Sequence, residues 1–139
     1  MKLFYALSRS KLGFKVKSAL FFKGESVENI LDIIHEQFNK DIEFNNNVLK
    51  IIKDYPKIVF LTGSPVEVAR TVLNKLPYEI KIKSEIIGMA LETENGVYTG
   101  KVKEHPFCCG KRKFVKIKAG KTDFDGIGNS FYDIPFLQL

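Results

Sequence analysis

An apolar run, KIVFLT at residues 57–62, passes directly into a segment with the pattern of a helix, GSPVEVARTVLNKL at residues 63–76. A continuous apolar run is typical of a strand that is covered on both faces of a parallel sheet. The segment after it carries a stripe of apolar residues at helical spacing: Val68, Ala69, Val72, Leu73 and Leu76. A strand that leads directly into a helix is half of a βαβ unit, and α/β proteins bind ligands at the turn between the two. We therefore predict an α/β protein.

The turn between this strand and helix has several residues that favour a helix start. Ser64 is the predicted N-cap, Pro65 takes the first helical position, and Glu67 lies three residues after Ser64, as in a capping box. A well-capped helix here directs free backbone N–H groups toward the end of the preceding strand. This is the arrangement that binds anions in many α/β proteins.

The other elements follow from periodicity and turn residues. Before the strand we expect three helices: one that ends at Gly24, one over residues 26–38 with Ser26 as the N-cap, and one that starts at the Asn cluster at residues 45–47 and stops before Pro56. After the helix we expect a strand at YEIKIKS (78–84) and a strand, Asn-Gly turn and strand at IIGMALETENGVYTG (86–100). The C-terminal part is predicted to contain a short basic helix at CCGKRKFVKIKAG (108–120) and a last strand with its loop at DFDGIGNS (123–130).

Charge and cysteine content limit the partners and the compartment. The chain has 22 Lys and Arg against 16 Asp and Glu, for a net charge of +6, which attracts phosphate-bearing ligands from small esters to RNA. No apolar run is long enough to span a bilayer, so no membrane partner is expected. The two cysteines, Cys108 and Cys109, are adjacent and would bridge each other only with strain. We therefore expect reduced thiols and a cytoplasmic protein.

From Lys57 onward the chain resembles the haloacid dehalogenase superfamily, and within it the phosphoserine-phosphatase-like branch. KIVFLTGSP resembles the second motif of that family, CCGKRKFVKI its third, and GIGNSFYDIPFL its fourth, while IIGMALETENGVYTGKV resembles the hairpin that precedes the third motif. The helices before Lys57 resemble the helical cap of the branch. The resemblance implies a Rossmann-like parallel sheet with flanking helices, with residues 1–56 as a partial cap and residues 57–139 as the core, in one compact unit.

The resemblance also implies a phosphate site and a metal site. The hydroxyl of Thr62 and the backbone amides of Gly63 and Ser64 would hold a phosphoryl group. Lys113, with Lys111 as the reserve, would neutralise its charge. Asp133 and Asn129 stand at the two metal-binding positions of the fourth motif, which hold Mg²⁺ in the family.

Two departures from the family pattern count against phosphatase activity. Family members attack phosphorus with the first Asp of an Asp-x-Asp-x-Thr loop, and this chain has no such loop before Thr62. The nearest candidates there are Ser8 and Ser10, which cannot form an acyl phosphate. Asn129 replaces a carboxylate, and Mg²⁺ sites depend on carboxylates.

Asp123 and Asp125 of DFDG have the spacing of the two Asp residues in the missing Asp-x-Asp-x-Thr loop. The residues before them, KAGKT, are not an apolar strand, and the residues after them continue as the fourth motif does. We therefore assign DFDG to the fourth motif, with the first central strand of the family's sheet absent.

The sequence leaves three explanations for the absent nucleophile loop and the replaced carboxylate. The chain is a phosphatase-like protein that is impaired or inactive as this chain alone, with a phosphorylated small molecule as substrate if it is active. Alternatively it is a non-catalytic subunit whose basic segment from Lys111 to Lys121 contacts RNA or another anionic partner. In the third explanation the gene is truncated. Without the central strand, either the strands of the second and fourth motifs pair directly or the sheet has unpaired edges, and unpaired edges predict a homo-oligomer or a protein partner.

Overall fold

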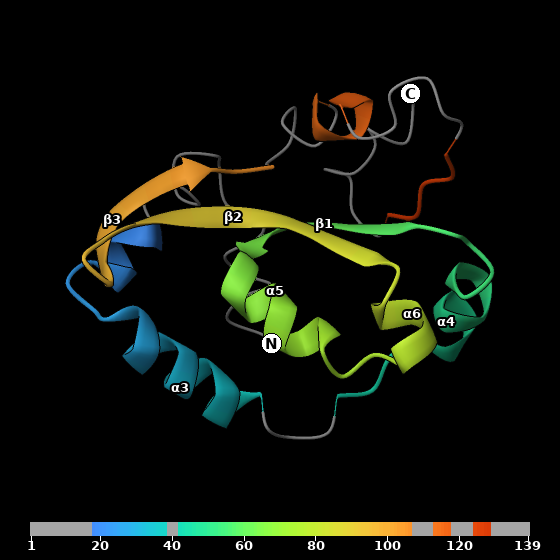
Figure 1. Ribbon diagram of the computed structural model, residues 1–139, viewed down its shortest axis with the longest axis horizontal. Coiled ribbons are helices and arrows are strands. Elements are labelled where there is room, and N and C mark those ends of the chain that lie inside the picture. Colours follow the sequence, from blue (N-terminus) through green and yellow to red (C-terminus); the bar gives the residue numbers. More distant parts are fainter. Residues whose placement is uncertain (1–17, 39–41, 107–112, 118–123, 129–139) are drawn as a thin grey trace.

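The structure is a computed structural model, and it describes residues 18–38, 42–106, 113–117 and 124–128 of the 139. Its elements, in chain order, are the 3₁₀ helix η1 (Ser18–Phe22), α3 (Val27–Gln37), α4 (Asn46–Ile52), β1 (Ile58–Pro65), α5 (Val66–Leu73), α6 (Tyr78–Lys81), β2 (Ser84–Glu94) and β3 (Val97–Glu104). Residues 113–117 form one further helical turn. Figure 1 shows the sheet across the middle of the molecule. The α/β class predicted from the sequence is confirmed.

The three strands of the sheet lie in the order β1-β2-β3. β1 and β2 are parallel, with Ile58 opposite Ser84 and Leu61 opposite Ile87, and the chain crosses between them through α5 and α6. β2 and β3 are antiparallel, so the sheet is mixed rather than wholly parallel. The predicted βαβ unit is present.

The hairpin between β2 and β3 turns at Asn95 and Gly96. Both have positive φ, 50° at Asn95 and 78° at Gly96, which a two-residue type I′ turn requires. Asn and Gly adopt these angles with less strain than other residues do. The Asn-Gly turn predicted from the sequence is confirmed.

The two helices before β1 are also confirmed, together with their caps. The hydroxyl of Ser26 accepts a hydrogen bond from the backbone N–H of Asn29 at 3.1 Å, at the start of α3. The side-chain oxygen of Asn45 accepts hydrogen bonds from the backbone N–H groups of Asn47 and Val48, at the start of α4. Such caps satisfy donors that the first helical turn cannot pair internally.

The predicted strand at residues 78–84 is wrong, because residues 78–83 form helix α6 and a turn, and only Ser84 lies in a strand, as the first residue of β2. Pro77 is the N-cap of α6, and its carbonyl accepts hydrogen bonds from the N–H groups of Ile80 and Lys81. The alternation of Tyr78, Ile80 and Ile82 suggested a strand, but only Ile80 is buried, at 2% exposure. The fixed φ of proline favours a helix start at this position, and α6 buries one residue rather than an alternating face.

Two further predictions differ from the structure at the ends of the chain. Of the segment predicted to be helical up to Gly24, the described part is the 3₁₀ helix η1, and residues 1–17 lie outside the described residues. Of the predicted last strand, residues 124–128 are described and contain no strand.

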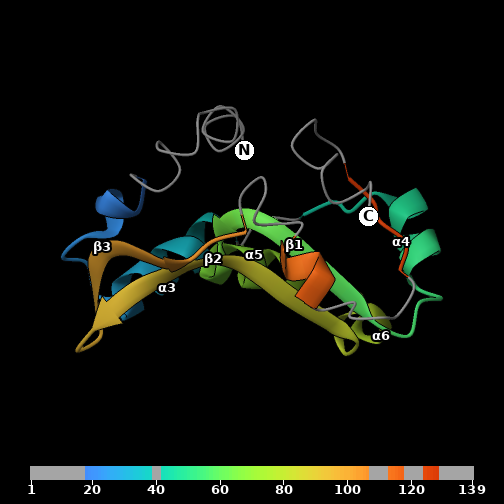
Figure 2. The ribbon, with the colours of Figure 1, turned by 90° about the horizontal axis from the view of Figure 1, so that it is seen from above.

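The helices α3 and α5 lie on one face of the sheet, and the 113–117 turn lies on the other (Figures 1 and 2). Two groups of buried residues hold these layers together. One joins η1, α3 and the hairpin, and the other joins α4, β1, α6 and the end of α5. The first contains Ala19, Met89, Leu91 and Tyr98; the second contains Ile52, Ile58, Leu76 and Ile80. Residues before and after Lys57 therefore pack together in both groups.

The two edges of the sheet differ. The outer edge of β3 is covered near its start, because the N–H of Gly24 donates to the carbonyl of Tyr98 and the N–H of Tyr98 donates to the carbonyl of Glu25. β1 has a strand neighbour on one side only among the described residues. Val59 on β1 is 38% exposed, so the double coverage expected for this strand is incomplete.

Candidate functional site

The predicted phosphate-binding residues lie in an irregularity of β1. Leu61 pairs with Ile87 and Pro65 pairs with Met89. Between these two pairs β1 advances by four residues and β2 by two. Thr62, Gly63 and Ser64 fall between these pairs and are half-buried. We call these three residues the β1 bulge. Bulges redirect side chains and are common next to active sites.

A local hydrogen bond holds the β1 bulge in shape. The backbone N–H of Ser64 donates to the hydroxyl oxygen of Thr62 at 3.1 Å. A hydroxyl that accepts from the N–H two residues later forms a turn typical of Ser and Thr. Thr62 and Ser64 are therefore already partners, and an anion that binds at this turn has to share or replace that hydrogen bond.

Gly88 on β2 makes room for the β1 bulge. A Cβ atom built on Gly88 would lie 2.9 Å from the carbonyl oxygen of Ser64 and 3.2 Å from the Cα of Val66. Both neighbours are backbone atoms, so they cannot move aside as a flexible side chain would. Gly88 is not among the site residues predicted from the sequence, although a glycine within a strand is a signal of close backbone approach.

The start of α5 differs from the sequence prediction by one residue. Pro65 is the N-cap rather than the first helical residue, and the helix begins at Val66. No side chain caps α5, so the predicted N-cap role of Ser64 and its capping box with Glu67 are wrong. The hydroxyl turn of the β1 bulge and the pairing of Pro65 with Met89 keep Ser64 within the strand.

Glu67 has a partner on β3 instead. Tyr98 is 2% exposed, and its pKa is raised to about 12, first by burial and then by the charge and the hydrogen bond of the Glu67 carboxylate. The Oε2 atom of Glu67 is buried and has no hydrogen-bond partner among the described residues. The carboxylate stands in the first turn of α5, where it interacts favourably with the positive end of the helix dipole. It also places a negative charge close to the predicted phosphate site.

The remaining predicted site residues are not brought to the β1 bulge by any described contact. Lys113 is exposed and lies in the 113–117 turn, on the face of the sheet opposite α5 (Figure 1). Lys111, Asn129 and Asp133 lie outside the described residues. The assignment of these residues to a phosphate site and a Mg²⁺ site therefore stays a prediction. Among the described residues, no group of three or more His, Cys, Asp or Glu side chains is placed to hold a metal ion.

Asp125, the second Asp of DFDG, has a structural partner. Its Oδ2 atom accepts a hydrogen bond from the hydroxyl of Tyr55, which follows α4. This hydrogen bond is the first cause of a raised Tyr55 pKa, followed by burial and by the negative charge of Asp125. The contact joins the 124–128 segment to the residues between α4 and β1, which is a structural role for Asp125 that its place in DFDG does not predict.

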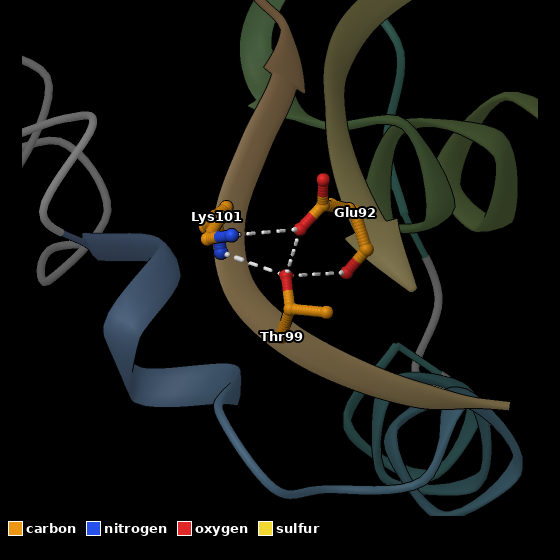
Figure 3. Close-up of polar contacts among 3 residues, drawn as sticks. All are labelled: Glu92, Thr99 and Lys101. Atoms are coloured by element: carbon orange, nitrogen blue, oxygen red, sulfur yellow. Dashed lines mark hydrogen bonds and ion pairs between the residues drawn. The ribbon is translucent and has the colours of Figure 1, made fainter. Parts of the chain in front are cut away.

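A second polar group lies on the hairpin, as Figure 3 shows. The hydroxyl of Thr99 donates to Oε2 of Glu92 at 2.6 Å and accepts from the N–H of Lys101 at 3.3 Å. The ammonium group of Lys101 lies 3.8 Å from the same Glu92 oxygen. The Lys101 side chain is 76% exposed. Cross-strand pairs of this kind stabilise antiparallel strands, so this group explains the hairpin rather than a reaction.

No helix in the described part of the chain is long and apolar enough to cross a membrane. Comparisons with models of known protein families, with curated proteins and with solved structures found no match.

Proposed function

We propose that the chain is a phosphatase-like protein, related to the phosphoserine-phosphatase-like branch of the haloacid dehalogenase superfamily, that binds phosphate esters without efficient turnover. The observation that carries this proposal is the position of the β1 bulge. It lies at the C-terminal end of a strand that is parallel to its neighbour, and it leads directly into α5. Ligands of open α/β sheets bind at such positions.

In this proposal the Thr62 hydroxyl and the backbone of Gly63 and Ser64 contact the phosphoryl oxygens. Lys113, or Lys111 in its place, supplies positive charge. Asp133 and the weaker ligand Asn129 would hold Mg²⁺, whose role would be to neutralise phosphate charge. The nearby Glu67 carboxylate opposes a doubly charged anion, so binding is expected to be weak and to depend on that divalent ion.

The test is a titration of the full chain with an aryl phosphate, with and without Mg²⁺, followed by calorimetry and by product release. We expect weak Mg²⁺-dependent binding and no hydrolysis above background. Thr62→Val should abolish binding, while Thr62→Ser, which keeps the hydroxyl, should retain it. The matched control is Thr99→Val, which removes a hydroxyl from the hairpin and should leave binding unchanged.

Two results would contradict the proposal. Binding that is equal in Thr62→Val and in the unaltered chain would remove the β1 bulge as the site. Hydrolysis that is lost in Asp133→Ala would show a competent enzyme rather than an impaired one.

A second function, that of a non-catalytic subunit, is supported by β1, which has a strand neighbour on one side only in the described part of the chain. The predicted homo-oligomer or protein partner would pair with the backbone of Val59 to Leu61 along that edge, which is apolar. An anionic partner such as RNA would contact the basic segment from Lys111 to Lys121, in which Lys113 and Lys116 are described and exposed. Light scattering tests whether copies of the chain pair through β1. Val59→Lys, on the β1 edge, should shift a dimer toward monomer, whereas Lys116→Gln, in the basic segment, should leave the dimer intact.

A further inference from the structure

Six lysines lie at the end of the sheet where β1 and β2 begin. They come from residues 50–57 and 75–85, which contain α4, α6 and the strand starts: Lys50, Lys53, Lys57, Lys75, Lys81 and Lys83. The same two stretches contain three acidic side chains, Asp54, Glu79 and Glu85. The other described residues contain six basic and ten acidic side chains. The positive charge of the described part is therefore concentrated at this end.

Hydrogen bonds and packing join the two stretches. The ammonium group of Lys83 donates to the carbonyl oxygen of Lys53, and the N–H of Ile58 donates to the carbonyl oxygen of Lys83 at 3.0 Å. The ammonium group of Lys81 donates to the carbonyl oxygen of Asn74 at 3.5 Å. The helices α4 and α6 share one group of buried residues and lie side by side in Figure 1. The two stretches therefore form one end of the molecule.

The contacts of these lysines leave the end positively charged. The partners of Lys81 and Lys83 are carbonyl oxygens, which are neutral, so these hydrogen bonds do not cancel the charge of either ammonium group. Lys57 has an anionic partner, the Glu85 carboxylate at 3.3 Å, but its side chain is 63% exposed, and exposed ion pairs are weak. Asp125 adds one more carboxylate beside this end. Six lysines therefore stand against four carboxylates.

An exposed aromatic ring lies among the lysines. Tyr78 is the first residue of α6 and is 71% exposed, and Ile82, one turn later, is 64% exposed. Ile80 between them is 2% exposed and anchors α6 in the core, so the Tyr78 ring is held outward. We call the six lysines with Tyr78 the α4–α6 surface. It lies where β1 begins, whereas the β1 bulge lies where β1 ends, so the two sites are separate.

We propose that the α4–α6 surface binds a single-stranded nucleic acid. Proteins that bind single strands combine basic side chains along the phosphates with aromatic rings on which bases stack. Here the lysines contact the phosphates and a base stacks on the ring of Tyr78. A double helix keeps its bases stacked on one another, so an outward ring favours a single strand. This site does not depend on the phosphate site proposed at the β1 bulge.

Two other classes of partner fit the α4–α6 surface less well. Protein interfaces are enriched in Arg and depleted in Lys, and all the basic side chains of this surface are Lys. The surface of a bilayer binds helices with a large apolar face, and α6 is a single turn that exposes only Tyr78 and Ile82. The concentration of lysines and the exposed ring together favour a nucleic acid.

Fluorescence anisotropy of the full chain with labelled single-stranded oligonucleotides of one sequence, as RNA and as DNA, tests this site. We expect binding to at least one of them, weakened by salt because each phosphate contact releases counterions. One variant removes three exposed lysines of the surface: Lys50→Gln, Lys53→Gln and Lys81→Gln. It should flatten the slope of log affinity against log salt by about 2, since each phosphate contact with a single strand contributes about 0.7.

The matched control removes the same charge near η1 and on β3, again from exposed side chains: Lys23→Gln, Lys101→Gln and Lys103→Gln. The control should keep the slope of the unaltered chain. A further variant, Lys113→Gln with Lys116→Gln, tests the basic segment and should weaken binding less than the α4–α6 variant does. Thr62→Val, which tests the β1 bulge, should leave oligonucleotide binding unchanged.

Tyr78 separates base stacking from charge. Tyr78→Ala should weaken oligonucleotide binding at least about fivefold, because a base loses its stacking partner, whereas Tyr78→Phe should retain binding. Binding of inorganic polyphosphate, which has no bases, should be the same in Tyr78→Ala and in the unaltered chain. The control is Phe21→Ala, which removes a ring that is 77% exposed on η1 and should leave oligonucleotide binding unchanged.

The substituted lysines and rings are exposed, so circular dichroism spectra should be unchanged in their variants. Binding to neither oligonucleotide, or equal salt slopes in the two triple variants, would overturn the proposal. Equal oligonucleotide affinity in Tyr78→Ala and Phe21→Ala would overturn it too. So would tighter binding to vesicles of anionic lipid than to either oligonucleotide, or a loss in the Lys113, Lys116 variant that equals the loss in the α4–α6 variant.

Discussion

Gly88 on β2 and Ser64 in the β1 bulge approach each other so closely that no side chain fits between them. A Cβ on Gly88 would lie 2.9 Å from the carbonyl oxygen of Ser64. The close contact joins the two parallel strands at the point where β1 leaves regular pairing. The shape of the predicted phosphate-binding turn therefore depends on a residue of the neighbouring strand.

Gly88→Ala should destabilise the protein by about 1–3 kcal/mol, because the added methyl group meets backbone atoms that can move only with the strand. Urea unfolding followed by circular dichroism measures the change. Thr93→Ala, an exposed substitution on the same strand, is the control and should stay within about 0.5 kcal/mol. An unchanged midpoint for Gly88→Ala would show that the bulge adapts to the methyl group.

Ser26 and Ser64 provide a matched pair of substitutions. Ser26 caps α3 through its hydroxyl, whereas no side chain caps α5. Ser26→Ala should therefore cost about 0.5–2 kcal/mol of unfolding free energy, the usual range for a lost N-cap. Ser64→Ala should cost clearly less, and an equal or larger loss would restore the capping role predicted from the sequence.

Ile80 and Ile82 test the correction from strand to helix at α6. Ile80 is 2% exposed and belongs to the group of buried residues around Ile52, Ile58 and Leu76, while Ile82 is 64% exposed. Ile80→Ala should destabilise the chain by about 2–5 kcal/mol, and Ile82→Ala by less than about 0.5 kcal/mol. Similar losses at both positions would favour a strand with one buried face. Thermal unfolding of the two variants side by side gives the comparison.

Tyr98 gives a pH dependence with a definite sign. Its folded pKa is raised to about 12 from the ordinary value of 10, so the folded state holds this proton more tightly than the unfolded state does. The stabilisation is complete below pH 10 and is lost as the pH rises from 10 through 12. Absorbance of tyrosinate should show one of the five tyrosines titrating near pH 12, and Tyr98→Phe should remove that step.

The Glu67 carboxylate supplies part of this pKa shift, so Glu67→Gln should move the Tyr98 titration toward lower pH. Tyr98→Phe should also lower the unfolding free energy near neutral pH by about 1–3 kcal/mol, because Glu67 then loses a buried donor. An unaltered titration curve in Glu67→Gln would contradict the pairing of the two side chains.

Local patterns predicted most of the elements in the described part of the chain. The cap at Ser26, the Asn cluster before α4 and the Asn95-Gly96 turn each use only residues close in sequence, and all three are present. The sequence predicts a strand where α6 forms, because Tyr78, Ile80 and Ile82 alternate as in a strand and the helix-favouring Pro77 is the weaker signal. In each case the deciding signal lay within a few residues.

The features of the candidate site were less predictable, because they depend on strand register and on distant partners. The β1 bulge exists only relative to β2, and nothing near Thr62 in the sequence specifies which residues of β2 it faces. Glu67 has the spacing of a capping box, yet its partner is Tyr98 on β3. Periodicity indicates which side chains turn inward but not which two polar groups meet there.

The unequal edges of the sheet limit how copies of this chain could associate. β3 is closed near its start by residues 24–27 and bears Lys101, Lys103 and Glu104 further along, whereas β1 has a free side in the described part of the chain. Charged side chains on an edge strand discourage pairing with another chain. A sheet with one free edge can pair with a second copy about a two-fold axis, and the free edges of both copies are then buried in the interface. If two copies pair as proposed, strand addition stops at two chains, because neither copy keeps a free side of β1 among its described residues.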